Sequence, residues 1–117
     1  MTLETILQRL LAIDGVTGAL LTGKDGLVVA STLEGEEEEL LGAMAAAAYD
    51  AAGRYIEQLG GGDIRHATFE TPGGTILVTD SGEMLIIVRC AVQANLGRVR
   101  MEVGAASLRL AEQIGSY

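Results

Sequence analysis

Aromatic residues are scarce in this sequence: its 117 residues include three tyrosines and one phenylalanine but no tryptophan. Apolar residues nevertheless make up 49% of the chain. The hydrophobic core must therefore be built from aliphatic side chains and alanine, which lets helices and strands pack closely. Because a chain of this length has room for one core, we expect a single domain over residues 1–117.

Basic residues are also few, with eight lysines and arginines against sixteen aspartates and glutamates, and the formal net charge is -8. An excess of negative charge repels phosphate groups, and the sequence has no basic stripe with interleaved aromatic residues. These features argue against a nucleic acid or an anionic membrane surface as the partner.

Cysteine and long hydrophobic runs are nearly absent. The single cysteine, Cys90, has no partner for an internal disulfide, which is typical of a reducing compartment. The longest apolar run, residues 43–49, is much shorter than the roughly 20 residues that span a bilayer. Residues 1–4 lack the basic and apolar segments of a signal peptide. We therefore expect a cytoplasmic protein without direct membrane insertion.

Residue patterns for catalysis or cofactor binding are missing as well. His66 is the only histidine, and a metal site or a catalytic triad needs partners that Cys90 alone does not supply. The glycines at positions 60–62 precede a predicted strand, not a helix, and no Lys-Ser or Lys-Thr pair follows them as in a phosphate-binding loop. We therefore expect no catalytic residues, no metal, no cofactor and no enzymatic activity.

Hydrophobic periodicity and turn residues predict three helices and five strands. Leucine and isoleucine repeat at three- and four-residue spacing after Thr2, which predicts a short helix that ends at Asp14-Gly15. Glycine-rich turns between β-rich runs predict hairpins and a largely antiparallel sheet. The unbroken apolar run 84–88 indicates a central strand covered on both faces. The predicted strands are residues 16–22, 27–32, 64–71, 75–79 and 84–91, and the later helices are residues 36–59 and the segment from Asn95 to about Ile114.

The long helix predicted over residues 36–59 divides into three faces when its residues are placed at about 100° intervals. A broad apolar face is expected to lie on the sheet, and a polar face carries Asp50, Arg54 and Glu57. A narrow line between them holds Gly42, Ala46, Tyr49 and Gly53. The broad apolar face consists of Leu41, Met44, Ala45, Ala48, Ala52, Tyr55, Ile56 and Leu59.

Two glycines on one line of a helix require an explanation, because each costs about 1 kcal/mol relative to alanine. One explanation is a second helix that approaches closely. In an antiparallel pair, Gly42 would face the partner's Gly53 and Ala46 would face the partner's Tyr49, as a two-fold contact requires. The alternative is that the glycines fit beneath a loop of the same chain. We favour the first explanation, which predicts a homodimer.

Three strings in the sequence are similar to the Roadblock family of dynein light-chain type, and to its bacterial MglB-like members. GVTGALL (residues 15–21) leading to DGLVVA (25–30) resembles the family's first hairpin. The alanine-rich helix with Leu41, Ala45 and Ala48 resembles its central helix, and ANLGRVR (94–100) resembles the entry into its last helix. The similarity spans nearly the whole chain.

The resemblance implies an α+β fold in the order α-β-β-α-β-β-β-α, with Roadblock-like and profilin-like layering. A five-stranded antiparallel sheet would carry one long helix on one face and two terminal helices on the other. Family members typically pair their central helices and the edge strand that here spans residues 64–71. The resemblance therefore implies that Arg65, Ala67 and Phe69 lie along the strand junction of the dimer. Pro72 directly after this strand suits an edge position.

The resemblance also implies a function without catalysis. Bacterial members partner with Ras-like small GTPases, and some accelerate GTP hydrolysis by remodelling the site of the GTPase. The expected function is a homodimeric regulator or adaptor that binds such a GTPase and modulates its hydrolysis or localisation. The expected contact residues on the exposed side of the paired helices are Ala43, Ala47, Asp50, Arg54 and Glu57. The alternative for each of them is plain solvated surface, with Arg54 paired to Asp50 four residues earlier.

The sequence is compatible with two other functions. One is a light-chain-like scaffold that positions a signalling or motility protein on the dimer without any GTPase. The other is a sensor of a small ligand on the sheet face beneath a helix. A ligand site needs a hollow with convergent polar groups, whereas the predicted inner faces are filled with aliphatic residues, so we rank the sensor last.

Overall fold

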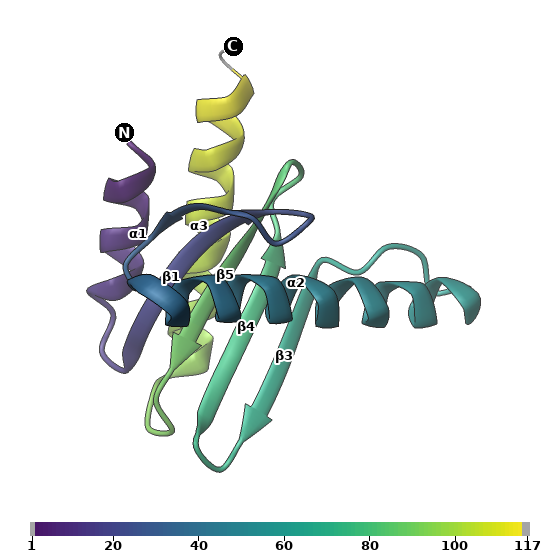
Figure 1. The fold of residues 1–117 in the computed structure, drawn as a ribbon, viewed down its shortest axis with the longest axis horizontal. Coiled ribbons are helices and arrows are strands. Elements are labelled where there is room, and N and C mark those ends of the chain that lie inside the picture. Colours follow the sequence, from purple (N-terminus) through teal and green to yellow (C-terminus); the bar gives the residue numbers. More distant parts are fainter. Residues whose placement is uncertain (1, 116–117) are drawn as a thin grey trace.

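The structure is a computed structural model that describes residues 2–115. Three helices and five strands follow one another in the predicted order (Figure 1). The helices are α1 (Leu3–Leu11), α2 (Gly35–Gln58) and α3 (Leu96–Gly115). The strands are β1 (Val16–Gly23), β2 (Val28–Ser31), β3 (His66–Thr71), β4 (Gly74–Asp80) and β5 (Met84–Cys90).

All five strands form one antiparallel sheet in the order β2-β1-β5-β4-β3. The central strand is β5, as its unbroken apolar run predicted. Its side chains alternate between the two faces: Ile86 and Val88 belong to the cluster on one side, whereas Leu85 and Ile87 belong to the cluster on the other. A strand buried on both faces needs apolar residues at every position, which is why β5 shows no polar alternation.

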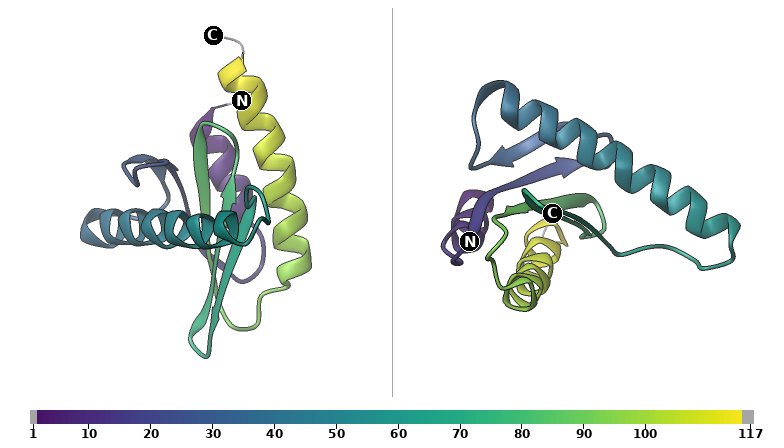
Figure 2. Two further views of the ribbon diagram at one scale, coloured as in Figure 1. Left: turned by 90° about the vertical axis from the view of Figure 1, so that its right-hand side faces the viewer. Right: turned by 90° about the horizontal axis from the view of Figure 1, so that it is seen from below.

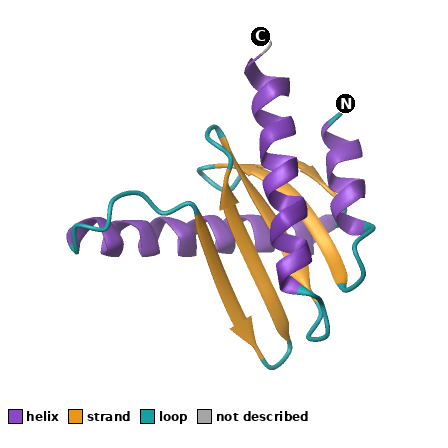
Figure 3. Ribbon diagram, turned by 180° about the vertical axis from the view of Figure 1, so that it is seen from behind, coloured by secondary structure: helices purple, strands orange, loops and turns teal. Residues whose placement is uncertain are grey.

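Helices α1 and α3 cover one face of the sheet, and α2 crosses the other (Figure 3). This layering confirms the predicted α+β fold. Helices α1 and α3 each begin at a capping side chain: the Thr2 hydroxyl accepts a hydrogen bond from the Thr5 N–H at 3.2 Å, and the Asn95 Oδ1 accepts one from the Arg98 N–H at 3.1 Å. Each bond satisfies an amide that has no partner within the first turn of its helix.

The end of α2 is fixed by the glycines at positions 60–62. The Gly60 N–H donates to the carbonyl of Glu57 at 3.0 Å, and the Gly61 N–H donates to the carbonyl of Ile56 at 3.0 Å. This pair of bonds is a Schellman motif, and it needs a left-handed residue, a role that Gly60 fills with φ 78°. The glycine run therefore ends the helix, as expected from the sequence.

Helix α2 is longer than the sheet is wide. Its 24 residues span about 36 Å at 1.5 Å per residue. Five strands at a spacing of about 4.8 Å place the two outer strands only about 19 Å apart. The helix packs on β1, β2, β4 and β5, and its C-terminal half projects past β3 (Figures 1 and 2). We call this projecting part the α2 overhang.

Candidate interaction surface on helix α2 and strand β3

Strand β3 is the open edge of the sheet, as the resemblance implied. Five of its six residues are exposed, and Ala67 is half-buried. Ala67 and Phe69 pair with Val78 and Ile76 of β4, which places them on the α2 side of the sheet. An edge strand with free backbone groups is a template for pairing with another strand. We call β3 together with the exposed part of α2 the α2–β3 surface.

The predicted strand began too early. Ile64 and Arg65 precede β3, and the Arg65 carbonyl accepts a hydrogen bond from the Asp80 N–H at 2.8 Å. Arg65 is exposed and lies next to the strand, not within it. Of the three residues expected along the strand junction, Ala67 and Phe69 therefore lie on the edge strand itself, and Arg65 lies at its beginning.

The first two residues of the predicted helix line face their own chain. Gly42 and Ala46 are buried. A Cβ on Gly42 would lie 3.1 Å from the Gly26 carbonyl oxygen and 3.1 Å from the Val28 Cγ2. The close approach that requires Gly42 is therefore made by the β1–β2 turn, which is the alternative explanation considered from the sequence. The expected pairing of Gly42 and Ala46 with a second helix is wrong, because both are covered within the chain.

The prediction that the whole broad apolar face of α2 lies on the sheet is also wrong in part. Ala45 packs on the sheet, but Met44 is 63% exposed and Tyr55 is 64% exposed. The helix instead turns its small residues toward the sheet and leaves larger ones outside. Exposed apolar residues recur along the outer side of the helix at three- and four-residue spacing: Leu40, Met44, Ala47, Ala51 and Tyr55. We call this set the α2 stripe; its spacing was visible in the sequence but was not recognised as a separate face.

Gly53 differs from Gly42 in its surroundings. It lies on the α2 overhang, and the nearest atom to an added Cβ is the Ile64 Cγ1 at 4.0 Å. Nothing within the chain therefore requires a glycine at this position. Gly53 remains a candidate for contact with a second copy.

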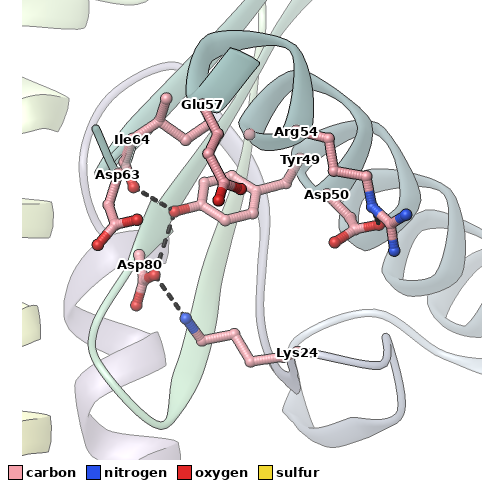
Figure 4. A pocket seen from close by; sticks show the side chains of 9 residues that line it. Lys24, Tyr49, Asp50, Arg54, Glu57, Asp63, Ile64 and Asp80 are labelled. Carbon is pink, nitrogen blue, oxygen red and sulfur yellow. Dashed lines mark hydrogen bonds and ion pairs between the residues drawn. The ribbon is translucent and has the colours of Figure 1, made fainter. Parts of the chain in front are cut away.

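Tyr49 links α2 to the segment that leads into β3 (Figure 4). Its hydroxyl lies 2.6 Å from the Ile64 carbonyl oxygen and 3.1 Å from the Asp80 Oδ2. Both are acceptors, so the single hydroxyl hydrogen is shared between them. Lys24, in the β1–β2 turn, forms an ion pair with the same Asp80 oxygen. Tyr49 therefore positions the entry into β3, a role that no sequence signal indicated.

This network shifts the ionisation of both acidic members. Burial, together with the nearby Asp80 carboxylate, raises the pKa of Tyr49 to about 12. Burial alone would raise the pKa of Asp80, but the hydrogen bond and charge of Lys24 and the Gly82 N–H lower it overall. Tyr49 therefore stays neutral and able to donate across the neutral pH range.

The same residues line a hollow of about 390 Å³ between α2 and the loop before β3. Two of the expected partner contacts, Asp50 and Arg54, form an ion pair at 3.0 Å on its rim (Figure 4). Glu57 lines the hollow too, and all five expected partner contacts are exposed. The alternative pairing of Arg54 with Asp50 is therefore present in the structure, and it leaves the arginine on the helix surface.

The described residues offer little for catalysis. Among residues 2–115, no group of three or more histidine, cysteine, aspartate or glutamate side chains is arranged to hold a metal ion. Cys90 is buried, and burial raises the pKa of its thiol, which disfavours the nucleophilic thiolate. His66 has its Nδ1 3.1 Å from the Thr79 Oγ1 and behaves as an ordinary strand residue. No helix within the described part of the chain has the length and apolar character needed to cross a membrane.

Fold and surface together define a class of protein: a small α+β domain with an open sheet edge and an exposed apolar helix face, features typical of protein-binding domains. The family model of the Roadblock/LC7 domain matches residues 2–90. The uncharacterized protein MJ0714 of Methanocaldococcus jannaschii is 38% identical over 106 residues, which cover 90% of this chain and 90% of that protein. The chain belongs to the Roadblock/LC7 family, whose members are generally non-enzymatic adaptors or regulators.

Solved structures agree with this assignment at the level of the fold. The Roadblock/LC7 domain from Streptomyces avermitilis has a TM-score of 0.91 at 20% identity, covering 97% of this chain and 98% of that one. Myxococcus xanthus MglB has a TM-score of 0.87 at 20% identity, covering 100% of both chains. Profilin IB of Acanthamoeba castellanii shares the layering, with a TM-score of 0.65 at 16% identity over 96% of this chain and 98% of that one.

Proposed function

We propose that this protein is a non-catalytic homodimeric adaptor of the cytoplasm that binds a Ras-like small GTPase on its paired α2 helices. The observation that carries the dimer is the α2 overhang. A helix that extends past its own sheet leaves its underside, with Gly53 and Ile56, without a sheet to cover it. The neighbouring edge strand β3 has free backbone groups. Both features lie on the same border of the molecule.

A two-fold axis normal to the sheet at β3 would satisfy both features. It would pair the two β3 strands antiparallel and carry each overhang across the sheet of the partner. Helix α2 crosses only one half of its own sheet face, and the other half is bare (Figure 1). A hollow of about 510 Å³ on this bare half is lined by Phe69, Ile76 and Arg89, among others. In this arrangement, Gly53 and Ile56 on the underside of the overhang would face the apolar side chains of Phe69 and Ile76 in the partner's hollow, which favours the contact.

Gly53→Leu tests the dimer by light-scattering mass on a sizing column. A Cβ at this position has room within one chain, whereas a leucine would collide with a second copy packed beneath the overhang. We expect the wild type at twice the 12.2 kDa chain mass and the variant at the mass of one chain. The matched control is Gly104→Leu, at an exposed helix glycine whose added Cβ would meet no atom within 4 Å, and this variant should keep the dimer. A dimer of unchanged mass in Gly53→Leu would refute this arrangement.

The outer side of α2 supports a protein partner in addition to the second copy. The α2 stripe presents apolar side chains to solvent and includes Ala47, and the other exposed residues expected from the family resemblance lie beside it: Ala43, Asp50, Arg54 and Glu57. A contiguous exposed apolar face of this kind is typical of a protein-interaction site. Arg54 pairs with Asp50 on the exposed side of the helix, and we propose that the adaptor binds and positions the GTPase and inserts no arginine into its active site.

The GTPase proposal is tested with a Ras-like GTPase from the same organism, loaded with GDP or with a slowly hydrolysed GTP analogue. We expect the mass of the dimer to increase with the GTP form and not with the GDP form. Ala47→Arg, in the middle of the α2 stripe, should abolish this increase while the dimer persists. If neither form binds to an intact dimer, the GTPase assignment fails, and a light-chain-like scaffold is the better description. That result leaves the dimer itself standing.

A further inference from the structure

Helix α3 is apolar on two opposite faces. One face is buried against the sheet and α1 and consists of Val99, Val103, Ala106 and Leu110. The opposite face is open to solvent and consists of Gly97, Met101, Gly104, Leu108 and Ala111. Met101 is 77% exposed and Leu108 is 70% exposed. A helix with apolar residues on both sides is normally covered on both sides, and the sheet covers only one.

The spacing of the open face is that of a helix-pairing seam. Its five residues follow one another at intervals of four, three, four and three, which is the a/d pattern of a heptad repeat. The large residues Met101 and Leu108 alternate with Gly97, Gly104 and Ala111, which leave room for a close neighbour. An added Cβ at Gly104 would meet no atom within 4 Å. We call this face the α3 seam; it matches the surface of another helix better than that of an extended strand.

The charge beside the seam indicates what kind of helix fits. Arg98 and Arg100 occupy the positions that flank the seam in its first turns, and both are exposed. Neither takes part in an ion pair recorded among residues 2–115; Arg100 makes only a 3.5 Å contact with the Thr68 hydroxyl. Glu112 is the one acidic flanking residue, and it lies at the far end of the helix.

The charge of α3 contrasts with that of the rest of the chain. Helix α3 carries three arginines and two glutamates, whereas α2 carries six acidic residues and one arginine. In a chain with a net charge of -8, α3 therefore differs in having a small excess of positive charge, and two of its arginines flank the seam. A hollow of about 470 Å³ extends the seam toward β3; Arg65, His66, Gly104 and Leu108 line it, together with Asp63 and Asp80.

We propose that the α3 seam binds an acidic amphipathic α-helix of a partner protein. The apolar side of that helix packs on Met101 and Leu108, and acidic residues along its flank pair with Arg98 and Arg100. Flanking charges of this type set which partner pairs with a seam and in which orientation. The seam lies on the face of the sheet opposite α2 (Figure 3), so its partner and a protein on the α2–β3 surface can bind at the same time. The proposal does not depend on the dimer or on the GTPase.

The test uses the full chain and two synthetic helical peptides of three heptads, with leucine at every a position and alanine at every d position. One peptide has glutamate at all flanking positions, and the other has lysine. In fluorescence anisotropy at low salt, we expect the glutamate peptide to bind at least about tenfold more tightly than the lysine peptide. Arg98→Glu with Arg100→Glu should reverse this preference. The matched control, Arg9→Glu with Arg54→Glu, changes the net charge by the same amount outside the seam and should keep the preference for the glutamate peptide.

Three results would overturn the proposal. Both peptides could fail to bind, the two could bind equally, or the control variant could change its preference between the peptides as much as the seam variant does. Leu108→Glu separates a partner helix from a second copy of this chain. Leu108 is mostly exposed, so the variant should fold with an unchanged melting temperature and lose the glutamate peptide. If the Leu108→Glu variant without peptide has a lower mass than the wild type without peptide, the seam is a contact between copies, and the assignment to a partner protein is wrong.

Discussion

The two faces of the sheet are covered in different ways. On one face, α1 and α3 insert leucine, isoleucine and valine side chains into a large buried cluster. On the other face, α2 contributes mainly Ala45 and Ala46 to a smaller cluster and leaves part of the sheet bare. Figure 2 shows the same contrast from the side: α1 and α3 lie along the sheet, whereas α2 extends beyond it. We therefore expect the first face to provide most of the folding stability, whereas the second leaves apolar surface exposed.

The largest expected effect is the difference in the free energy of unfolding between two variants, each with a large apolar residue truncated on one of the two faces. Leu110→Ala removes a fully buried side chain beneath α3 and should lower the free energy of unfolding by about 2–5 kcal/mol. Met44→Ala removes a side chain that is 63% exposed on α2 and should change it by less than about 0.5 kcal/mol. Urea unfolding of both variants at the same protein concentration measures the two values. Similar losses in both would contradict the contrast between the faces.

A smaller loss of stability is expected when the polar contacts of Tyr49 on α2 are removed. Tyr49→Phe removes the hydroxyl that binds the Ile64 carbonyl and Asp80, and should cost about 1 kcal/mol at neutral pH. The pKa of Tyr49 is raised from 10.0 to about 12 in the folded chain, so the fold favours the neutral phenol. Its contribution is fully present below pH 10 and is lost as the pH rises toward 12.

This dependence is measured by urea unfolding of the wild type and Tyr49→Phe at neutral and at strongly alkaline pH. The stability advantage of the wild type over the variant should shrink at alkaline pH. Because other groups titrate equally in both proteins, the difference isolates Tyr49. An advantage that does not change with pH would show that the phenol is not held in its neutral form.

The smallest expected effect is a difference in melting temperature between alanine variants at Gly42 and Gly53 of α2. At a protein concentration too low for two copies to pair, Gly53→Ala should raise the melting temperature, because alanine favours a helix by about 1 kcal/mol and the new Cβ has space within the chain. Gly42→Ala should fail to gain this amount, because its Cβ would press on the Gly26 carbonyl and on Val28 at 3.1 Å. Thermal melts of the two variants at equal concentration test the contrast. Equal gains would mean that the β1–β2 turn does not require Gly42.

The fold could be predicted from the sequence because its signals are local. Alternation, turn glycines and the caps at Thr2 and Asn95 each act within a few residues, and the central position of β5 follows from its own unbroken apolar run. The open edge at β3 was implied by the family resemblance and by Pro72. The error in the first residues of β3 has a different origin, because the carbonyl of the apolar Ile64 accepts a hydrogen bond from Tyr49, which is a tertiary contact.

The orientation of α2 could not be predicted in the same way. Most of its positions are apolar, and alanine is compatible with both a buried and an exposed face, so hydrophobicity alone does not indicate which side meets the sheet. The deciding contact is between Gly42 and the β1–β2 turn, which is a tertiary contact. The ion pair between Lys24 and Asp80 likewise joins residues 56 positions apart. The α3 seam forms a second apolar repeat in the sequence. The buried repeat of the same helix was enough to predict the helix, so the sequence did not indicate a separate exposed face.

The few aromatic residues are unevenly distributed in the structure. Within the described residues 2–115, Tyr49, Tyr55 and Phe69 are all the aromatic side chains, and each lies on α2 or β3. With no tryptophan in the chain, tyrosine dominates its near-ultraviolet absorption and emission. Near-ultraviolet circular dichroism therefore observes α2 and β3, together with Tyr117 outside the described residues, without any attached label. A tryptophan on a bound protein would emit at longer wavelength, so the two sides of a complex can be followed separately in one sample.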